Sequence, residues 1–155
     1  DSSGAGSTIK LDGSAWNGAN TGSNATISLT DSNWTGDNSG AGLSLIADNS
    51  KWNGSTNAAG SATLTNGSSW TGASTSADFA LTLNGSTWNN SGASSLKSFN
   101  ATNGIVDMTN AAASVTIGSY SGQCGPQDCN AGTCISERTG QNSLCNEHYR
   151  RASDR

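Results

Sequence analysis

Carboxylates are the side chains in the repetitive part of this chain that could catalyse a reaction, and they are few. They lie at Asp12, Asp31, Asp37, Asp48, Asp78 and Asp107. Enzymes that cleave polysaccharides group such carboxylates with Arg or Lys, but no Arg or His precedes residue 124, and Lys10, Lys51 and Lys97 are scattered. The first, second and fourth aspartates fall near one expected corner of the backbone, where Asp is favoured for its turn geometry. We therefore expect no enzymatic activity, no catalytic residue and no cofactor.

A second group of reactive side chains is confined to the end of the chain. The cysteines Cys124, Cys129, Cys134 and Cys145 have the spacing Cys-x4-Cys-x4-Cys-x10-Cys, and His148 follows three residues later. Thiolates and imidazole could bind zinc, but this spacing lacks the close Cys-x2-Cys pairs of structural zinc sites. Four cysteines also allow three disulfide pairings, which an exported protein would permit. We expect no metal site here, and whether these cysteines form disulfides stays open.

Five tryptophans are the most regular feature of the sequence, because each follows the previous one by 18 positions. They are Trp16, Trp34, Trp52, Trp70 and Trp88, and the chain has no others. A serine stands two residues before each of them, at Ser14, Ser32, Ser50, Ser68 and Ser86. A glycine stands two residues after the first four, and Asn90 stands two residues after the fifth. Exposed rings in such a row could stack on sugars, whereas buried rings would form a core. Because other bulky side chains are scarce, we expect the rings to point inward.

Strand and corner signals must position these tryptophans. Two mostly apolar columns precede them by seven and five positions: Ile9, Ile27, Leu45, Thr63 and Leu81, then Leu11, Leu29, Ala47, Thr65 and Leu83. Alternate residues of a strand share a face, so the columns predict one short strand in each unit, and the Ser-x-Trp run predicts another. Pairs such as Asp12-Gly13 and Asn84-Gly85 lie between the two strands. Such residues tolerate the left-handed backbone of a sharp corner.

These units predict an all-β fold, a right-handed parallel β-helix (solenoid) with coils of 18 residues. Single coils cannot bury a core, but coils stacked in register about 4.8 Å apart can do so. We expect coils at residues 8–25, 26–43, 44–61, 62–79, 80–97 and 98–122, with two well-formed sides and a loose polar third side. An antiparallel meander would not need strict 18-residue register. A left-handed hexapeptide helix would need a third apolar column, which the polar residues at Thr21, Ser39 and Asn57 do not supply.

The composition fits a thin core with a polar surface. Hydrophobic residues make up 32% of the chain, against about 45–50% in globular proteins, and charged residues make up 12%, about half the usual share. The net charge is −4 and the repeats contain no basic cluster, so we expect no nucleic-acid partner. The chain begins in mid-repeat at Asp1, and we expect it to be part of a longer protein.

Three runs near residue 100 resemble a known family. They are residues 81–88 (LTLNGSTW), residues 95–108 (SLKSFNATNGIVDM) and residues 115–122 (VTIGSYSG). The order of a Ser-Thr-Trp corner, a Leu-rich coil, an Asn-Gly-x-Val-Asp corner and a strand ending near Ser-Gly is similar to the C-terminal part of pertactin-like and AIDA-like autotransporter passengers. The resemblance covers about residues 9–122. It implies a right-handed β-helix that is exported through the outer membrane of a Gram-negative bacterium by a translocator β-barrel.

The composition changes abruptly after Gln123. Every Cys and Arg, both Glu, the one Pro and the one His follow this residue. The family pattern would continue here with more β-helix and then the translocator, and neither is present. Residues 123–155 therefore read as an irregular tail, for which we keep three explanations: a disulfide-linked or disordered extension, a zinc site, and a shifted reading frame.

The repeats and the resemblance together predict a structural role. We expect a surface-displayed autotransporter passenger segment that acts as a stalk or adhesin without catalysis, with an unidentified ligand on a host cell or bacterial surface. The alternative is a carbohydrate-binding or carbohydrate-active β-helix that uses the tryptophan column. Ice binding would need unbroken outward threonine columns, and the positions after each Trp alternate between Asn and Thr, beginning with Asn17 and Thr35. Because the terminal coils of a solenoid are open, we also expect end-to-end self-association.

Overall fold

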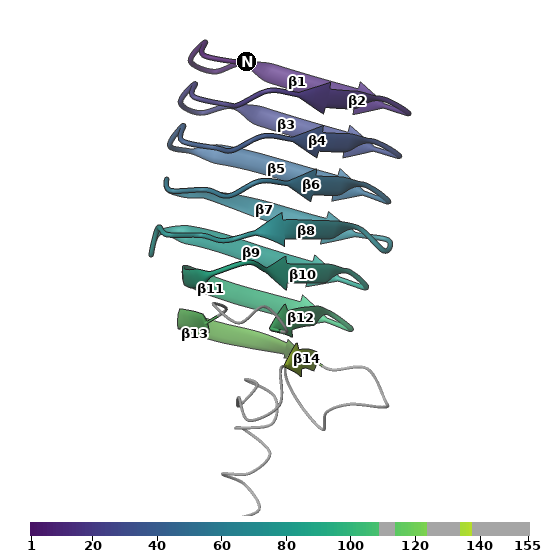
Figure 1. Ribbon diagram of the computed structural model, residues 1–155, viewed down its shortest axis with the longest axis vertical. Coiled ribbons are helices and arrows are strands. Elements are labelled where there is room, and N and C mark those ends of the chain that lie inside the picture. Colours follow the sequence, from purple (N-terminus) through teal and green to yellow (C-terminus); the bar gives the residue numbers. More distant parts are fainter. Residues whose placement is uncertain (109–113, 124–133, 138–155) are drawn as a thin grey trace, which may run out of the picture.

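The computed structural model describes residues 1–108, 114–123 and 134–137, which form two parallel seven-stranded sheets (Figure 1). The first sheet contains β1 (Thr8–Asp12), β3 (Thr26–Thr30), β5 (Leu43–Asp48), β7 (Gly60–Thr65), β9 (Phe79–Asn84), β11 (Ala93–Thr102) and β13 (Ser114–Gln123). The second contains β2 (Ala15–Asn17), β4 (Asn33–Thr35), β6 (Lys51–Asn53), β8 (Ser69–Gly72), β10 (Thr87–Asn90), β12 (Ile105–Met108) and β14 (Cys134–Glu137). The described residues include no helix long and apolar enough to cross a membrane.

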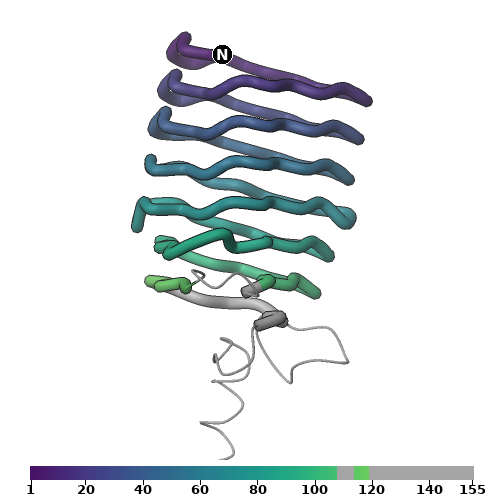
Figure 2. The backbone as a smooth tube through the Cα atoms, viewed as in Figure 1, coloured from purple at the N-terminus to yellow at the C-terminus, as the bar shows by residue number. Residues whose placement is uncertain are grey.

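The chain winds as a solenoid in which each coil gives one strand to each sheet. The coils stack along the long axis of the molecule, as Figure 2 shows. In Figure 1 the chain crosses the more distant sheet from left to right and returns along the nearer sheet as it descends, so the winding is right-handed. Ile9 pairs with Ile27, and Trp16 with Trp34, so equivalent residues of successive repeats lie side by side. The predicted β-solenoid is therefore confirmed.

The corner between the two strands of each coil places one residue in the left-handed region. Gly13 (φ 58°), Asp31 (φ 48°), Asn49 (φ 47°), Gly85 (φ 59°) and Asn103 (φ 52°) occupy this corner. Only Gly, Asn and Asp adopt such φ values at low cost, which explains why these residue types recur there. The corner turns the chain sharply enough for the two sheets to face each other across a narrow core.

The core is a set of columns, each made of residues at equivalent positions in successive coils. From β3 to β11, the inward-facing aliphatic residues of the first sheet are almost fully buried, and so are the tryptophans from Trp34 to Trp88 in the second sheet. In the first coil, Ile9, Leu11 and Trp16 are only half-buried, because β1 and β2 each pair with a strand on one side only. Further along, Phe99 continues the Leu81 column and Val106 continues the Trp88 column.

The predicted apolar columns are wrong in the fourth coil. Ala62, not Thr63, pairs with Leu45, and Leu64, not Thr65, takes the next buried position. The strand β7 therefore lies one position earlier than the 18-residue spacing requires. The corner that follows absorbs the extra residue, because Asn66 (φ 56°) and Gly67 (φ 75°) both take left-handed conformations there. Burial of two apolar side chains in place of two threonine hydroxyls favours this register.

The third side of the solenoid is not the loose polar connection that the sequence predicted. Asn20, Asn38, Thr56 and Ser74 pair in parallel from coil to coil and are buried. Asn20 Nδ2 donates to Asn38 Oδ1 over 2.7 Å, and Asn38 Nδ2 donates to Thr56 Oγ1 over 3.0 Å. Polar side chains can line this side because each forms a hydrogen bond with its neighbour along the column.

The strands continue beyond the predicted end of the array at residue 122. The strand β13 runs to Gln123 and pairs with β11, with an offset that accommodates the residues between β12 and β13. Four residues of the predicted irregular tail, Cys134–Glu137, form β14 and pair with β12. Cys124, Cys129 and Cys145 lie outside the described residues.

Candidate functional site: the tryptophan column

The five tryptophans form one continuous stack along the inside of the second sheet. Ring centroids of neighbouring tryptophans lie 5.0, 4.9, 4.9 and 5.0 Å apart from Trp16 to Trp88, and the ring planes differ by 7°, 3°, 8° and 7°. These values describe offset parallel stacking, the favoured arrangement for two aromatic faces. Strand pairing sets the geometry, because each Trp Cα lies beside the next in the parallel register.

From Trp34 onward, each indole N–H donates a hydrogen bond to the coil before it. Trp34 Nε1 donates to the carbonyl oxygen of Gly18 over 2.8 Å, and Trp52 Nε1 donates to that of Gly36 over 2.9 Å. The same bond recurs from Trp70 to Gly54 (2.7 Å) and from Trp88 to Gly72 (3.0 Å). A buried indole N–H without an acceptor would be costly, so these carbonyls make inward-facing tryptophan tolerable.

The glycines two residues after each Trp are required by close backbone approach. A Cβ built on Gly36 would lie 1.9 Å from the oxygen of Gly18, and one on Gly54 would lie 1.9 Å from the oxygen of Gly36. The same oxygens accept the indole hydrogen bonds. Glycine at Gly36 and Gly54 therefore lets these carbonyls stay within reach of the Trp in the next coil, and the glycine column ends at Asn90.

The serine column that precedes the tryptophans closes the corners. Ser50 Oγ donates to the oxygen of Asp48 over 2.7 Å and accepts the backbone N–H of Ser32 over 3.0 Å. Ser32 and Ser68 make the equivalent bonds in their own coils. Ser32, Ser50, Ser68 and Ser86 are buried, whereas Ser14 is exposed at the first coil. Ser32, Ser50 and Ser68 are therefore structural, since each of these hydroxyls bonds to the backbone of two neighbouring coils.

Replacing Ser50 with alanine tests this role. The change leaves the buried N–H of Ser32 without its acceptor, and we expect the free energy of unfolding to fall by about 2 kcal/mol, the cost of an unsatisfied buried donor. Urea unfolding followed by circular dichroism measures the effect. Ser61→Ala is the matched control, because Ser61 is exposed on β7 and the same change there should have little effect. Equal losses in both variants would contradict the structural role.

The burial of the tryptophan rings argues against the alternative in which these rings bind sugars. Trp34, Trp52, Trp70 and Trp88 are 0% exposed, so their faces contact other rings of the protein and cannot stack on a ligand. Trp16 alone is partly accessible, at the edge of the first coil. The prediction that the rings point inward is confirmed, and a carbohydrate-binding platform made of this column is excluded.

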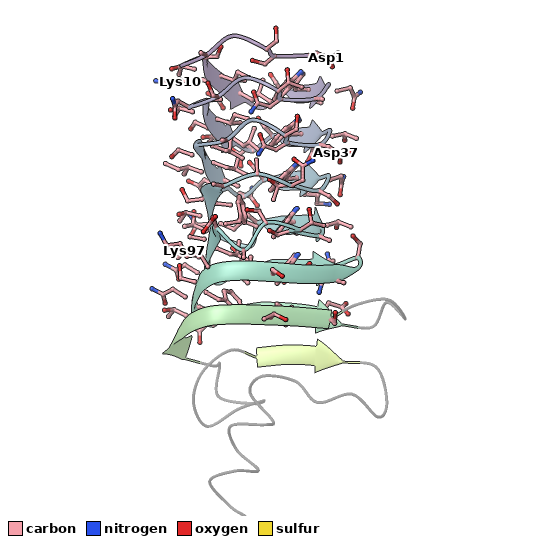
Figure 3. The ribbon with its side chains drawn as sticks, turned by 90° about the vertical axis from the view of Figure 1, so that its left-hand side faces the viewer. Asp1, Lys10, Asp37 and Lys97 are labelled. Carbon is pink, nitrogen blue, oxygen red and sulfur yellow. The ribbon has the colours of Figure 1, made fainter. Side chains whose placement is uncertain are left out.

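The charged side chains are not gathered into a catalytic cluster in the described part of the chain. Lys10 and Lys97 lie on one side of the molecule but far apart along its axis, and Asp37 lies on the opposite side (Figure 3). Aspartates at the corners bond to neighbouring coils: Asp31 Oδ1 and Asp48 Oδ1 each accept from an Asn Nδ2 over 2.7 Å. The described residues also contain no group of three or more His, Cys, Asp or Glu that could hold a metal ion.

Sequence reasoning missed the buried amide column on the third side. Asn20 and Asn38 are 18 positions apart, like the tryptophans, so the spacing was a usable signal. The column considered above for a third apolar side is the neighbouring one that begins at Thr21, and Thr21 is exposed. The Oδ1 atom of Asn20 is buried and has no hydrogen-bond partner, and Ser2 occupies the equivalent position in the adjacent segment.

No family model, curated protein or solved structure matches this chain. The resemblance to autotransporter passengers therefore stays a prediction, and the functional argument depends on the fold and its contacts.

Proposed function

We propose that the chain is a structural segment of an autotransporter passenger, a β-solenoid stalk of the adhesin type displayed on the surface of a Gram-negative bacterium. The observation that carries the proposal is the continuous parallel pairing of the two sheets through seven strands each. The side chains with distinctive chemistry, Trp and Ser, make the contacts that hold neighbouring coils together. Such a molecule supplies length and a repetitive polar surface rather than a reactive centre.

The outer surface supports a display role. Alternate residues of the strands point outward, and on β3 and β7 these are Thr26, Ser28, Thr30, Ser61, Thr63 and Thr65. Such small uncharged hydroxyl side chains solvate the sheet without the charged groups that most protein surfaces use. We propose that an adhesive contact, with a surface ligand on a host cell or another bacterium, is made by this repetitive face and by the loops, with no single decisive residue.

Surface display is tested on bacteria that carry the gene for this chain. An antibody against residues 1–108 should label intact cells as strongly as permeabilised cells, and added protease should remove the label without lysis. Labelling that requires permeabilisation would contradict the proposed location.

The stalk role is tested by removing one coil. Deletion of residues 26–43 joins Ala25 to Ser44, which takes the position of Thr26 in the register, so the chain should fold and lose one coil, about 4.8 Å of height. We expect the shortened protein still to be displayed on the surface and to mediate adhesion, with fewer cells adhering than for the full chain. Deletion of residues 26–39 is the control, because it breaks the register and should abolish folding. Complete loss of adhesion with a folded 26–43 deletion would point to a localised binding site instead.

We also propose that isolated chains associate end to end. The half-buried Ile9, Leu11 and Trp16 form an apolar edge beside the free hydrogen-bonding edge of β1, and such an edge accepts further strands. Sedimentation velocity should show larger species as concentration rises. Leu11→Lys places a charge at this edge and should shift the protein toward monomer. Wild-type protein that stays monomeric at high concentration would contradict the prediction.

A further inference from the structure

The tryptophan stack has a property that a stalk does not require, which is uninterrupted contact between π systems. Five rings follow one another with centroid separations of 4.9–5.0 Å and nearly parallel planes, and no other residue interrupts the series. The series ends at Val106, which continues the column after Trp88 with an aliphatic side chain. Indole is among the most easily oxidised side chains, so such a column can share a positive charge among neighbouring rings.

Two contacts stabilise an indole radical cation in the middle of the stack. A cation is attracted to an aromatic face, and Trp34, Trp52 and Trp70 each have an aromatic face on both sides. Each of these rings also donates its N–H to a carbonyl oxygen 2.7–2.9 Å away, and such a bond strengthens when the donor becomes charged. Burial disfavours a localised charge, and delocalisation over several rings reduces that penalty.

The same hydrogen bond keeps the proton in place. An oxidised indole becomes strongly acidic at Nε1, but its partner in this column is a backbone carbonyl, which does not take the proton. The rings from Trp34 to Trp88 are 0% exposed, so water does not reach their faces. Oxidation therefore yields a radical cation rather than a deprotonated neutral radical.

Access to the column is confined to one end. Trp16 is half-buried, with one face against Trp34, whereas the other four rings are fully enclosed. Trp16 also makes no Nε1 hydrogen bond of the kind that holds the other four. A dissolved outer-sphere oxidant therefore meets the stack at Trp16.

We propose that the column from Trp16 to Trp88 is a one-electron relay. A dissolved one-electron oxidant takes one electron from Trp16 and is itself reduced by one electron. Trp34 then transfers an electron to oxidised Trp16, and repeated transfers move the positive charge into the enclosed rings. No covalent bond forms or breaks in the four enclosed rings, where each Nε1 proton stays on its hydrogen-bonded nitrogen. A dissolved one-electron reductant such as ascorbate returns the electron at Trp16 and restores the column.

Two double variants have the same amino-acid composition but differ in whether their remaining tryptophan rings touch. Comparing them tests the effect of ring contact at a constant number of tryptophans. Trp70→Phe with Trp88→Phe leaves Trp16, Trp34 and Trp52 in continuous contact. Trp34→Phe with Trp70→Phe leaves Trp16, Trp52 and Trp88, none of which touches another. Phenylalanine keeps an apolar ring in the column, and circular dichroism establishes that both variants retain the β-solenoid.

Transient absorption after laser-flash generation of ruthenium(III) tris-bipyridine, applied to the full chain, tests the proposal. We expect a near-infrared charge-resonance band, the signature of a cation shared between stacked rings, in the wild type and in the connected variant. The band should be lost in the separated variant, where the localised radical at Trp16 remains. Absence of the band in the wild type would overturn the relay whatever the variants do, and bands of equal size in the two variants would also overturn it.

Discussion

Replacing Gly54 with alanine is expected to lower the free energy of unfolding by about 3 kcal/mol, near the upper end for overpacked sites. The new Cβ would lie 1.9 Å from the oxygen of Gly36, which is backbone and cannot rotate away. Relief of that clash would push apart two coils and weaken the bond from Trp52 Nε1 to the same oxygen. Alanine also restricts the unfolded chain, which favours folding by about 0.4–1 kcal/mol, too little to offset the clash.

Gly92→Ala is the matched control for this change. A Cβ on Gly92 would meet only the Ala73 side chain, at 3.8 Å, which is ordinary contact. Urea unfolding of the two variants should therefore show a lower midpoint for Gly54→Ala and a midpoint close to wild type for Gly92→Ala. A Gly54→Ala variant as stable as the control would show that the coils separate easily, and the close-approach argument would be wrong.

Replacing Trp52 with alanine is expected to lower the free energy of unfolding by about 4 kcal/mol, as for other large aromatic side chains removed from a core. Trp52 is 0% exposed and stacks on Trp34 and Trp70 at centroid distances of 4.9 Å. Its removal leaves a cavity in the middle of the stack and leaves the carbonyl of Gly36 without its indole donor. Thermal and urea unfolding both measure the loss.

Ile46→Ala provides the comparison for Trp52→Ala. Ile46 is a large apolar side chain on the outer face of β5 and is 49% exposed, so its truncation should change stability by less than about 0.5 kcal/mol. Near-UV circular dichroism adds a second readout, because coupled stacked indoles give a strong signal that Trp52→Ala should reduce and Ile46→Ala should not. Equal stability of the two variants would mean that the stack contributes little to the fold.

The β-solenoid could be predicted because its period is visible in residues that have few other uses. Tryptophan is rare and large, so five of them at one spacing indicate a shared environment, and the Asx and Gly corners between strands confirm the path of the chain. Inward-facing rings also followed from the shortage of other bulky side chains. The hydrogen bonds of Trp Nε1 to glycine oxygens could not be predicted, since they depend on the relative rotation of adjacent coils.

The errors arose where one repeat differs from its neighbours in backbone path rather than in residue type. Thr63 and Thr65 have the 18-residue spacing, but Ala62 and Leu64 occupy the buried positions. This is possible because the corner that follows can lengthen by one residue. The third side was misjudged for a related reason. A polar residue such as Asn38 suggests exposure when it is considered alone, and its burial becomes favourable only when a polar residue of the adjacent coil supplies the hydrogen bond.

Contacts that join each coil only to its immediate neighbours determine how this molecule would respond to a pulling force. The strand pairs, the serine bonds and the indole bonds all connect adjacent coils. Tension at one end would therefore detach coils one at a time, since no contact shares the load along the whole length. Each detached coil would release roughly 60 Å of extended chain while shortening the folded part by only about 4.8 Å. A cell held by such a segment would be tethered by an extensible element that lengthens in steps and rewinds onto its remaining coils when the force falls.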